Sequence, residues 1–211
     1  MTSNYIKKLY DYVSPIQDKI KFCKGSMIIC IVIDLALVLA MIFVNENKAY
    51  FFLVLFFMLI MHIIIGLNAM KYTKKKSNIM FEILILEEYI NDLELSEEEI
   101  QTLDEILEGM DKEKCDFKVE KENIFVTFDK KFIVTMRKHK NTGRLFEMCR
   151  TDKIDLVKTS ETNGEVEITF FSNGNEEEPI IDFNITNAVN GIEEINMLLN
   201  KNYSGIKFEK E

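Results

Sequence analysis

Two long apolar stretches dominate the first third of the chain. Met27–Val44 has eighteen residues with a single charge, Asp34, and Tyr50–Met70 has twenty-one residues in which only His62 charges near neutral pH. Each stretch is long enough to cross a hydrocarbon core of about 30 Å as a helix. Buried core helices are not favoured, because the rest of the chain is too small to bury two such helices. A cleaved signal peptide is not favoured either, because the first stretch starts late and its flanks do not suit cleavage. The sequence therefore predicts a two-helix transmembrane hairpin over residues 26–70.

Basic residues flank this hairpin on one side. Five lysines precede the first stretch, four follow the second and one lies in the turn: Lys7, Lys8, Lys19, Lys21 and Lys24, then Lys71, Lys74, Lys75 and Lys76, and Lys48. Because cytoplasmic flanks carry the excess of Lys and Arg, we expect both termini, and the bulk of the chain, on the cytoplasmic side of the cell membrane. Within the N-terminal segment 1–25, Ser14, Pro15 and Gln17 form a helix-start pattern. It predicts a short amphipathic helix that begins at Pro15 and places its lysines near anionic headgroups.

The two ionisable residues in the apolar stretches fall at the same depth. In a hairpin that turns near Lys48, Asp34 lies fourteen residues before the turn and His62 fourteen residues after it. Because an unpaired charge inside a bilayer is costly, we predict a hydrogen bond or ion pair that locks the hairpin. Proton or ion translocation is the alternative, but two helices do not enclose a path, so it requires an oligomer or a larger complex.

Small residues indicate where the helices pack. Cys30 and Gly66 match in depth by the same counting, and Gly66 and Ala69 share the face of the second helix that carries His62. Small side chains allow helices to approach closely in a membrane. A second small face, formed by Ala36 and Ala40, is left for another subunit, either a second copy of the chain or a different membrane protein.

A basic juxtamembrane stretch and an acidic connector occupy residues 71–111. Between Lys76 and Lys112 there are twelve Asp and Glu and no basic residue, yet apolar residues recur at intervals of three and four. We predict two amphipathic helices, 78–93 and 97–108, the second with a capping box at its start. A coiled-coil stalk is less favoured because the register breaks near Glu97. A calcium site is not favoured either, because the acids lack the spacing of a calcium-binding loop.

The last part of the chain, residues 112–211, changes to a period of two. Turn-forming residues separate seven candidate strands, and a final apolar stripe beginning near Asn187 predicts a closing helix. The predicted strands are Asp116–Glu120, Ile124–Phe128, Lys131–Met136, Arg144–Arg150, Asp155–Ser160, Glu165–Ser172 and Pro179–Ile185. The expected fold class is therefore a membrane helical hairpin joined to a soluble α+β domain.

Three segments of this domain resemble the pleckstrin-homology-like (PH-like) domains of bacterial small membrane proteins. They are the strand, turn and strand of Ile124–Thr135, the strand entry Lys153–Val157 and the segment Gly164–Ile168, and they are followed by the terminal helix. The resemblance implies a seven-stranded antiparallel barrel, or strongly bent sheet, with the helix plugging one end. It implies no catalytic residues.

A basic loop stands out in this acidic domain. Arg137, Lys138, Lys140 and Arg144 carry four positive charges within eight residues that contain no acid. In eukaryotic domains of the resembled fold, an early basic hairpin grips phosphoinositide headgroups, so contact with anionic lipid is one interpretation. Pairing with the acidic connector is a second, and a solvated hairpin tip is a third.

Charge and motif content narrow the function. Residues 78–211 hold thirty-one acidic against sixteen basic residues, which argues against nucleic acid as a partner. The four cysteines form no C-x-x-C pair and are expected to be reduced, and no cofactor-binding or catalytic motif occurs. We expect no enzyme, no metal and no cofactor. The first functional hypothesis is a membrane-anchored, non-catalytic module that binds a protein or anionic lipid; the alternative is an accessory subunit of a transporter or channel.

Overall fold

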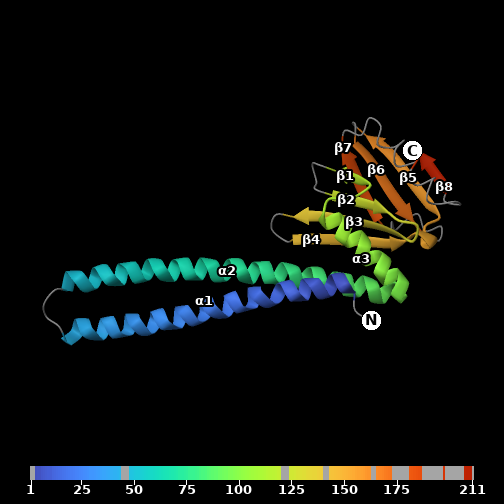
Figure 1. Cartoon of the computed structure of the whole chain (residues 1–211). Helices are drawn as coiled ribbons and strands as arrows, with labels where there is room; N and C mark the ends of the chain where they lie inside the picture. The colour runs from blue at the N-terminus through green and yellow to red at the C-terminus, as the bar shows by residue number, and fades with distance from the viewer. Residues whose placement is uncertain are drawn as a thin grey trace. The chain divides into compact units, whose positions relative to one another are not determined.

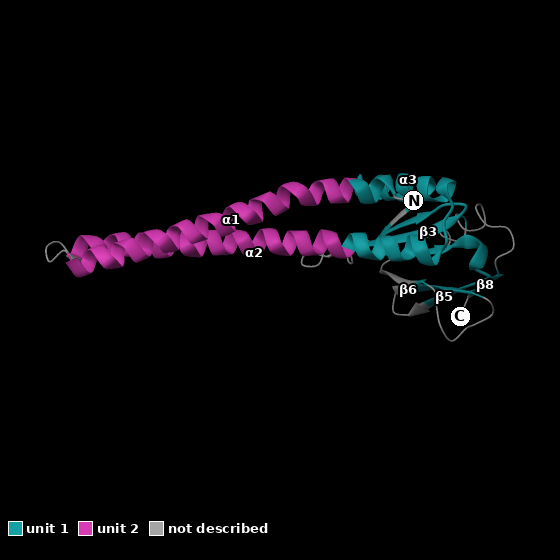
Figure 2. Cartoon of the chain, turned by 90° about the horizontal axis from the view of Figure 1, so that it is seen from below, with its two compact units in different colours: residues 1–7, 82–211 teal, residues 8–81 magenta. Residues whose placement is uncertain are grey.

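The computed structural model describes residues 3–43, 48–119, 124–139, 143–162, 165–172, 181–186, 197 and 207–210. In this part of the chain there are three α-helices, one short 3-10 helix and eight β-strands (Figure 1). Internal contacts divide the chain into two compact units (Figure 2). The hairpin unit comprises residues 8–81, and the sheet unit comprises residues 1–7 together with residues 82–211.

The hairpin unit consists of two long antiparallel helices. Helix α1 spans Asn4–Phe43 and helix α2 spans Lys48–Asp92. At 1.5 Å per residue, their 40 and 45 residues give lengths of about 60 and 68 Å, roughly twice the thickness of a hydrocarbon core. The most apolar window of each helix is not buried by the rest of the protein. This exposed apolar surface, beside a small sheet domain, fits a membrane-anchored protein with a soluble domain.

Helix α1 begins earlier than the sequence predicts. The structure places Pro15 inside a continuous helix that starts at Asn4, so the prediction of a helix beginning at Pro15 is wrong. A proline inside a helix removes one backbone hydrogen bond and costs about 3 kcal/mol. The helix nevertheless continues, because Leu9, Val13 and Ile16 form a buried apolar stripe with helical spacing on both sides of the proline.

The acidic connector contributes to two helices. Its first part does not form a separate helix, because residues 78–92 continue α2 without a break. Its second part forms α3, Glu97–Asp111, which starts with the predicted capping box. The Ser96 side chain accepts a hydrogen bond from the Glu99 amide, and the Glu99 carboxylate accepts one from the Ser96 amide at 2.9 Å.

The strands of the sheet unit form two four-stranded sheets. The first has the order β1-β2-β3-β4 and is antiparallel throughout; the second has the order β7-β6-β5-β8, with β8 parallel to β5. Their bounds are Phe117–Val119, Ile124–Phe128, Phe132–His139 and Gly143–Arg150 for β1 to β4, and Leu156–Thr162, Glu165–Phe171, Ile181–Thr186 and Lys207–Lys210 for β5 to β8.

The core of the sheet unit lies on both sides of the first sheet. All five residues from Phe132 to Met136 are buried, because α3 contacts β2 and β3 while the second sheet approaches β4 through β7. The rings of Phe128 and Phe170 lie 6.4 Å apart and join the two sheets. From α3, the buried side chains of Ile100, Leu103, Leu107 and Met110 complete this core.

The predicted single barrel is not observed. The strands belong to two separate sheets, and no hydrogen-bonded strand pair closes them into a barrel among the described residues. The chain leaves β4 through the 3-10 helix η1, Thr151–Lys153, which turns it out of the first sheet. Hydrogen bonds from Thr151 to the Lys131 and Lys130 carbonyls hold this turn. The predicted closing helix near Asn187 falls outside the described residues.

Candidate functional site

The structure brings together the two ionisable residues of the apolar stretches. The Asp34 Oδ2 atom on α1 lies 3.5 Å from the His62 Nε2 atom on α2. The protein covers most of both side chains, leaving 30% of Asp34 and 19% of His62 exposed. The two side chains that the counting from Lys48 pairs therefore lie within contact distance of each other.

The second nitrogen of His62 has a partner of its own. Its Nδ1 atom lies 2.9 Å from the backbone carbonyl oxygen of Met58, one helical turn earlier on α2. The Asp34 Oδ1 atom, by contrast, is buried without a hydrogen-bond partner among the described residues. His62 is thus held in orientation by its own helix, and its Nε2 atom lies beside the Asp34 carboxylate.

The predicted helix-packing residues lie in mixed surroundings. Cys30, Ala40, Gly66 and Ala69 are half-buried, whereas Ala36 is exposed. A methyl group added at Gly66 would meet the Met27 side chain at 3.8 Å, an ordinary van der Waals distance. The helices therefore do not approach so closely at Gly66 that glycine is required there.

Arg144, one of the four basic-loop residues, is paired with acids. Its guanidinium contacts the carboxylates of Glu82 on α2 and Asp111 at the end of α3, the first at 2.6 Å, and lies 5.9 Å from the centre of the Tyr5 ring. Only 23% of its side chain is exposed. An anionic headgroup would have to displace two carboxylates to reach it.

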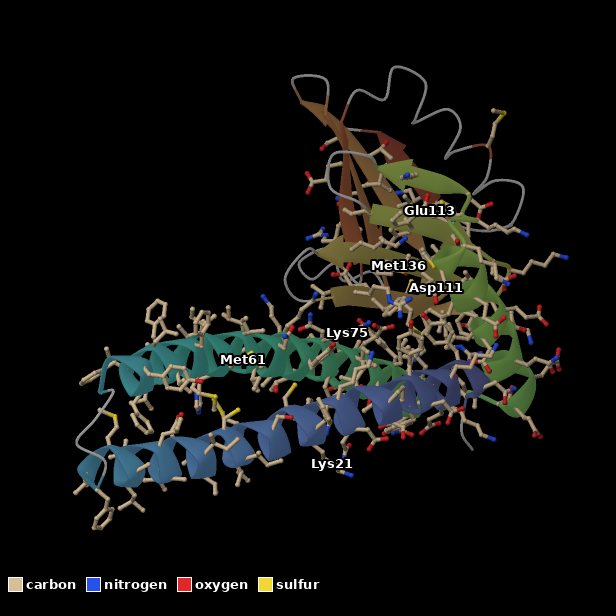
Figure 3. All side chains as sticks on the ribbon, turned by 60° about the vertical axis from the view of Figure 1, so that its left-hand side comes forward. Lys21, Met61, Lys75, Asp111, Glu113 and Met136 are labelled. Atoms are coloured by element: carbon tan, nitrogen blue, oxygen red, sulfur yellow. The ribbon has the colours of Figure 1, made fainter. Side chains whose placement is uncertain are left out.

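Lys138 also pairs with an acid, just beyond the end of α3. Its ammonium group lies 3.5 Å from Glu113, in the turn after α3, and 4.3 Å from the centre of the Phe125 ring. Asp111 and Glu113 both lie where α3 ends (Figure 3). Lys138 and Arg144 are directly opposed across β3 and β4, a like-charge pair that would repel without these acids. Two further ion pairs link α3 to the first sheet: Arg150 with Glu99 at 3.0 Å, and Lys131 with Glu98 at 3.4 Å.

The Arg144 contacts are those that the second interpretation of the basic loop, pairing with the acidic connector, expects, whereas Glu113, the partner of Lys138, lies just after the connector. Arg137 is half-buried on β3, and Lys140 lies outside the described residues. The side chains of Arg144 and Lys138 are therefore used within the sheet unit.

A cluster of hydrogen bonds at the start of the chain is not among the features predicted from the sequence. We call it the N-terminal clasp, and it consists of Ser3, Asn4 and Tyr5 with Asp104 and Asp111. The Asp104 carboxylate accepts hydrogen bonds from the Ser3 hydroxyl, from the Asn4 amide at 2.8 Å and from the Tyr5 amide at 3.3 Å. The Tyr5 hydroxyl donates to Asp111 at 3.0 Å. Because the first amides of a helix have no partner within it, a carboxylate placed there satisfies them and complements the helix dipole.

Glu82 lies deep in the same region. Only 3% of the residue is exposed, and its Oε1 atom contacts Arg144 as an ion pair rather than a well-aligned hydrogen bond. Burial raises the pKa of Glu82 to about 7, although the nearby Arg144 charge acts in the opposite direction. Burial also raises the pKa of Tyr5 above its usual range.

Two sequence signals point to the clasp in retrospect. Ser3 is a good N-cap residue, and its hydroxyl accepts a hydrogen bond from the Ile6 amide at 3.1 Å. Asp104 follows Leu103 directly and precedes Leu107 by three residues, so it borders the apolar stripe of α3. An acid at such a position is buried and needs a donor. The sequence gives no sign that this donor lies about one hundred residues away.

The two cysteines of the sheet unit are partly or fully buried. Burial raises the pKa of the Cys149 thiol to about 12, and burial likewise raises that of the half-buried Cys115 thiol. Among the described residues, no group of three or more His, Cys, Asp or Glu side chains is arranged to hold a metal ion.

Comparison of the chain with protein-family models, with curated proteins and with solved structures found no match. The resemblance to PH-like domains thus rests on the pattern of strands and turns and stays a prediction.

Proposed function

We propose that this protein is a membrane-anchored, non-catalytic docking module that presents its sheet unit to a protein partner at the cytoplasmic face of the cell membrane. The observation that carries this proposal is the N-terminal clasp. Through it, residues 3–5 at the start of α1 are bonded to α3, while the end of α2 also belongs to the sheet unit. The first residues of α1 and the last residues of α2 therefore both belong to the sheet unit.

The charge distribution supports the cytoplasmic orientation. The lysines that flank the apolar stretches, such as Lys21 on α1 and Lys75 on α2, lie beyond those stretches (Figure 3). The lysines also contact neighbouring side chains there: Lys75 lies 5.3 Å from the Tyr12 ring, and Lys19 lies 5.5 Å from the Tyr72 ring. A basic collar with aromatic residues is typical of the cytoplasmic membrane interface.

A protein partner is favoured over anionic lipid for the sheet unit. Residues 78–211 carry about fifteen net negative charges, and Arg144 and Lys138 are paired with acids of their own unit. An anionic bilayer repels such a surface. The strand and turn pattern that resembles PH-like domains adds support, because such domains serve recognition rather than catalysis.

Photo-crosslinking of the full-length chain in native membranes tests this proposal. A photoreactive residue at the exposed Glu167 on β6 is expected to capture a protein, and capture is expected to persist in the Asp34→Asn variant. The same capture must survive Lys138→Gln, because Lys138 serves an internal contact. The docking proposal fails if Glu167 captures no protein, or if lipid is its only product.

One observation favours a second function, an accessory subunit of a transporter or channel. Ala36 is exposed, and Ala40, one turn further along α1, is half-buried, so this side of α1 offers a small contact face. A photoreactive residue at Ala36 distinguishes the two functions. Capture of a membrane protein from Ala36, together with no capture from Glu167, establishes the accessory subunit instead of the docking module.

A further inference from the structure

We propose that Asp34 and His62 form a proton-binding site within the hairpin, and that this pair holds one proton more than an ionised aspartate and a neutral histidine would hold. The inference is independent of the docking function, because it rests on the hairpin unit alone. Its ligand is a single proton, held between the Asp34 Oδ2 atom and the His62 Nε2 atom, which lie 3.5 Å apart.

The contact with Met58 determines which nitrogen of a neutral His62 ring carries the hydrogen. A backbone carbonyl oxygen only accepts hydrogen bonds, so the Nδ1 atom, 2.9 Å from the Met58 oxygen, must carry the hydrogen and donate it. A neutral imidazole has one N–H group. In neutral His62, therefore, the Nε2 atom that faces Asp34 carries no hydrogen and presents a lone pair.

An ionised Asp34 side chain has no hydrogen to donate to this nitrogen. An ionised carboxylate is an acceptor only, so with neutral His62 two acceptors would face each other. The other oxygen, Oδ1, is buried and has no hydrogen-bond partner among the described residues. Such a pair would leave an uncompensated negative charge in an apolar stretch, which is strongly unfavourable.

One added proton removes this conflict in either of two ways. If the proton is on Nε2, His62 is an imidazolium that donates toward the ionised Asp34. If the proton is on the carboxyl group, Asp34 donates toward the Nε2 lone pair. The pair has no net charge in both states, and in both the Nδ1 contact with Met58 is kept.

The described part of the apolar stretches contains few other titratable residues. Cys30 lies one turn before Asp34 on α1. Apart from Asp34 and His62, the described part of the apolar stretches contains no Asp, Glu, Lys, Arg or His. We therefore assign the additional proton to Asp34 and His62. Without this proton, two hydrogen-bond acceptors, the Asp34 carboxylate and the His62 Nε2 atom, would face each other between α1 and α2. Binding of the proton therefore favours contact between the two helices at Asp34 and His62.

Nitrogen-15 NMR of the full-length chain in lipid nanodiscs at neutral pH tests the proposal. The chain has two histidines, so His139→Gln leaves His62 as the only source of imidazole signals. Two results support the site: an imidazolium, or a neutral Nδ1–H imidazole together with an infrared band of a protonated carboxyl group that disappears in Asp34→Asn.

The matched variant Asp34→Asn separates a shared proton from a merely structural contact. Its amide donates to Nε2 without an added proton, so His62 is expected to become a neutral Nδ1–H imidazole while the helices remain paired. If that variant does not insert, the nitrogen and infrared spectra of the His139→Gln protein alone decide the count. The proposal is overturned by a neutral Nε2–H imidazole, by a neutral imidazole without a protonated Asp34, or by an imidazolium that persists in Asp34→Asn.

Discussion

Glu82 shows how a single buried carboxylate makes the stability of the sheet unit depend on pH. Its pKa is about 7 in the folded protein against an ordinary value of 4.5, so between these pH values the folded state holds a proton that the unfolded state has released. The stabilising contribution of this proton is complete below about pH 4.5 and is lost as the pH rises through 7. A shift of this size corresponds to about 3 kcal/mol.

Glu82→Gln should remove this pH dependence, because glutamine has the shape of the protonated acid and does not titrate. As the pH rises from 5 to 8, we expect the β2–β4 amides of the wild type to become less protected from hydrogen exchange. At each pH, protection is compared with that of the same amides in Glu82→Gln. Glu105→Gln, on the exposed face of α3, is the matched control and should follow the wild type. Parallel pH profiles for wild type and Glu82→Gln would contradict the assigned pKa.

Cys149 provides a second test at the level of one residue. Its thiol is buried on β4 and its pKa is raised to about 12, so almost none of it is the reactive thiolate near neutral pH. We expect iodoacetamide to leave Cys149 unmodified in the folded protein and to modify it after unfolding, as measured by mass spectrometry of peptides. Rapid modification of Cys149 under native conditions would instead favour a regulatory thiol.

At the scale of elements, the N-terminal clasp ties the first turn of α1 to α3. Asp104→Ala removes the acceptor for three donors, and burying unsatisfied donors costs about 1–3 kcal/mol each. Release of the first turn should speed tryptic cleavage after Lys7 and Lys8 severalfold. Glu105→Ala, the next residue on α3, is the control. Equal cleavage rates in the two variants would mean that the clasp does not hold the N-terminus.

The elements also show what local patterns can and cannot predict. The α3 capping box and the strand pair β2–β3 follow from Ser96, Glu99 and the alternation on each side of Asp129–Lys130, because these signals are local. The continuous α2 was not predicted, since nothing local shows whether a helix stops after a basic stretch such as Lys74–Lys76. The parallel strand β8 was missed because its four residues find their partner β5 about fifty positions away.

In the candidate site, too, some contacts can be predicted from the sequence and others cannot. Asp34 and His62 were paired by counting from the turn, because a tight hairpin fixes which residues share a depth. Charge alone left three interpretations of the basic loop open: anionic lipid, the acidic connector and solvent. The structure shows Glu82 and Asp111 as partners of Arg144. The role of Ser3 and Tyr5 was not predicted, because long-range contacts of a chain end leave no periodic signal.

At the scale of the whole molecule, charge and hydropathy describe an asymmetric protein. Residues 1–77 carry about six net positive charges and include both apolar stretches, whereas residues 78–211 are strongly acidic. The exposed apolar windows of α1 and α2 suit a lipid environment, and the acidic sheet unit suits water. We propose a two-span anchor with the N-terminus and the sheet unit on the cytoplasmic side.

Cysteine accessibility measures this topology most directly. In a chain whose four cysteines are replaced by alanine, single cysteines at Glu46, between the two helices, and at Glu113, after α3, report the two sides of the membrane. With a membrane-impermeant maleimide on right-side-out vesicles, we predict labelling of Glu46→Cys at once and of Glu113→Cys only after permeabilisation. Labelling of Glu113→Cys in sealed vesicles, or release of the protein by alkaline carbonate, would contradict the two-span cytoplasmic anchor.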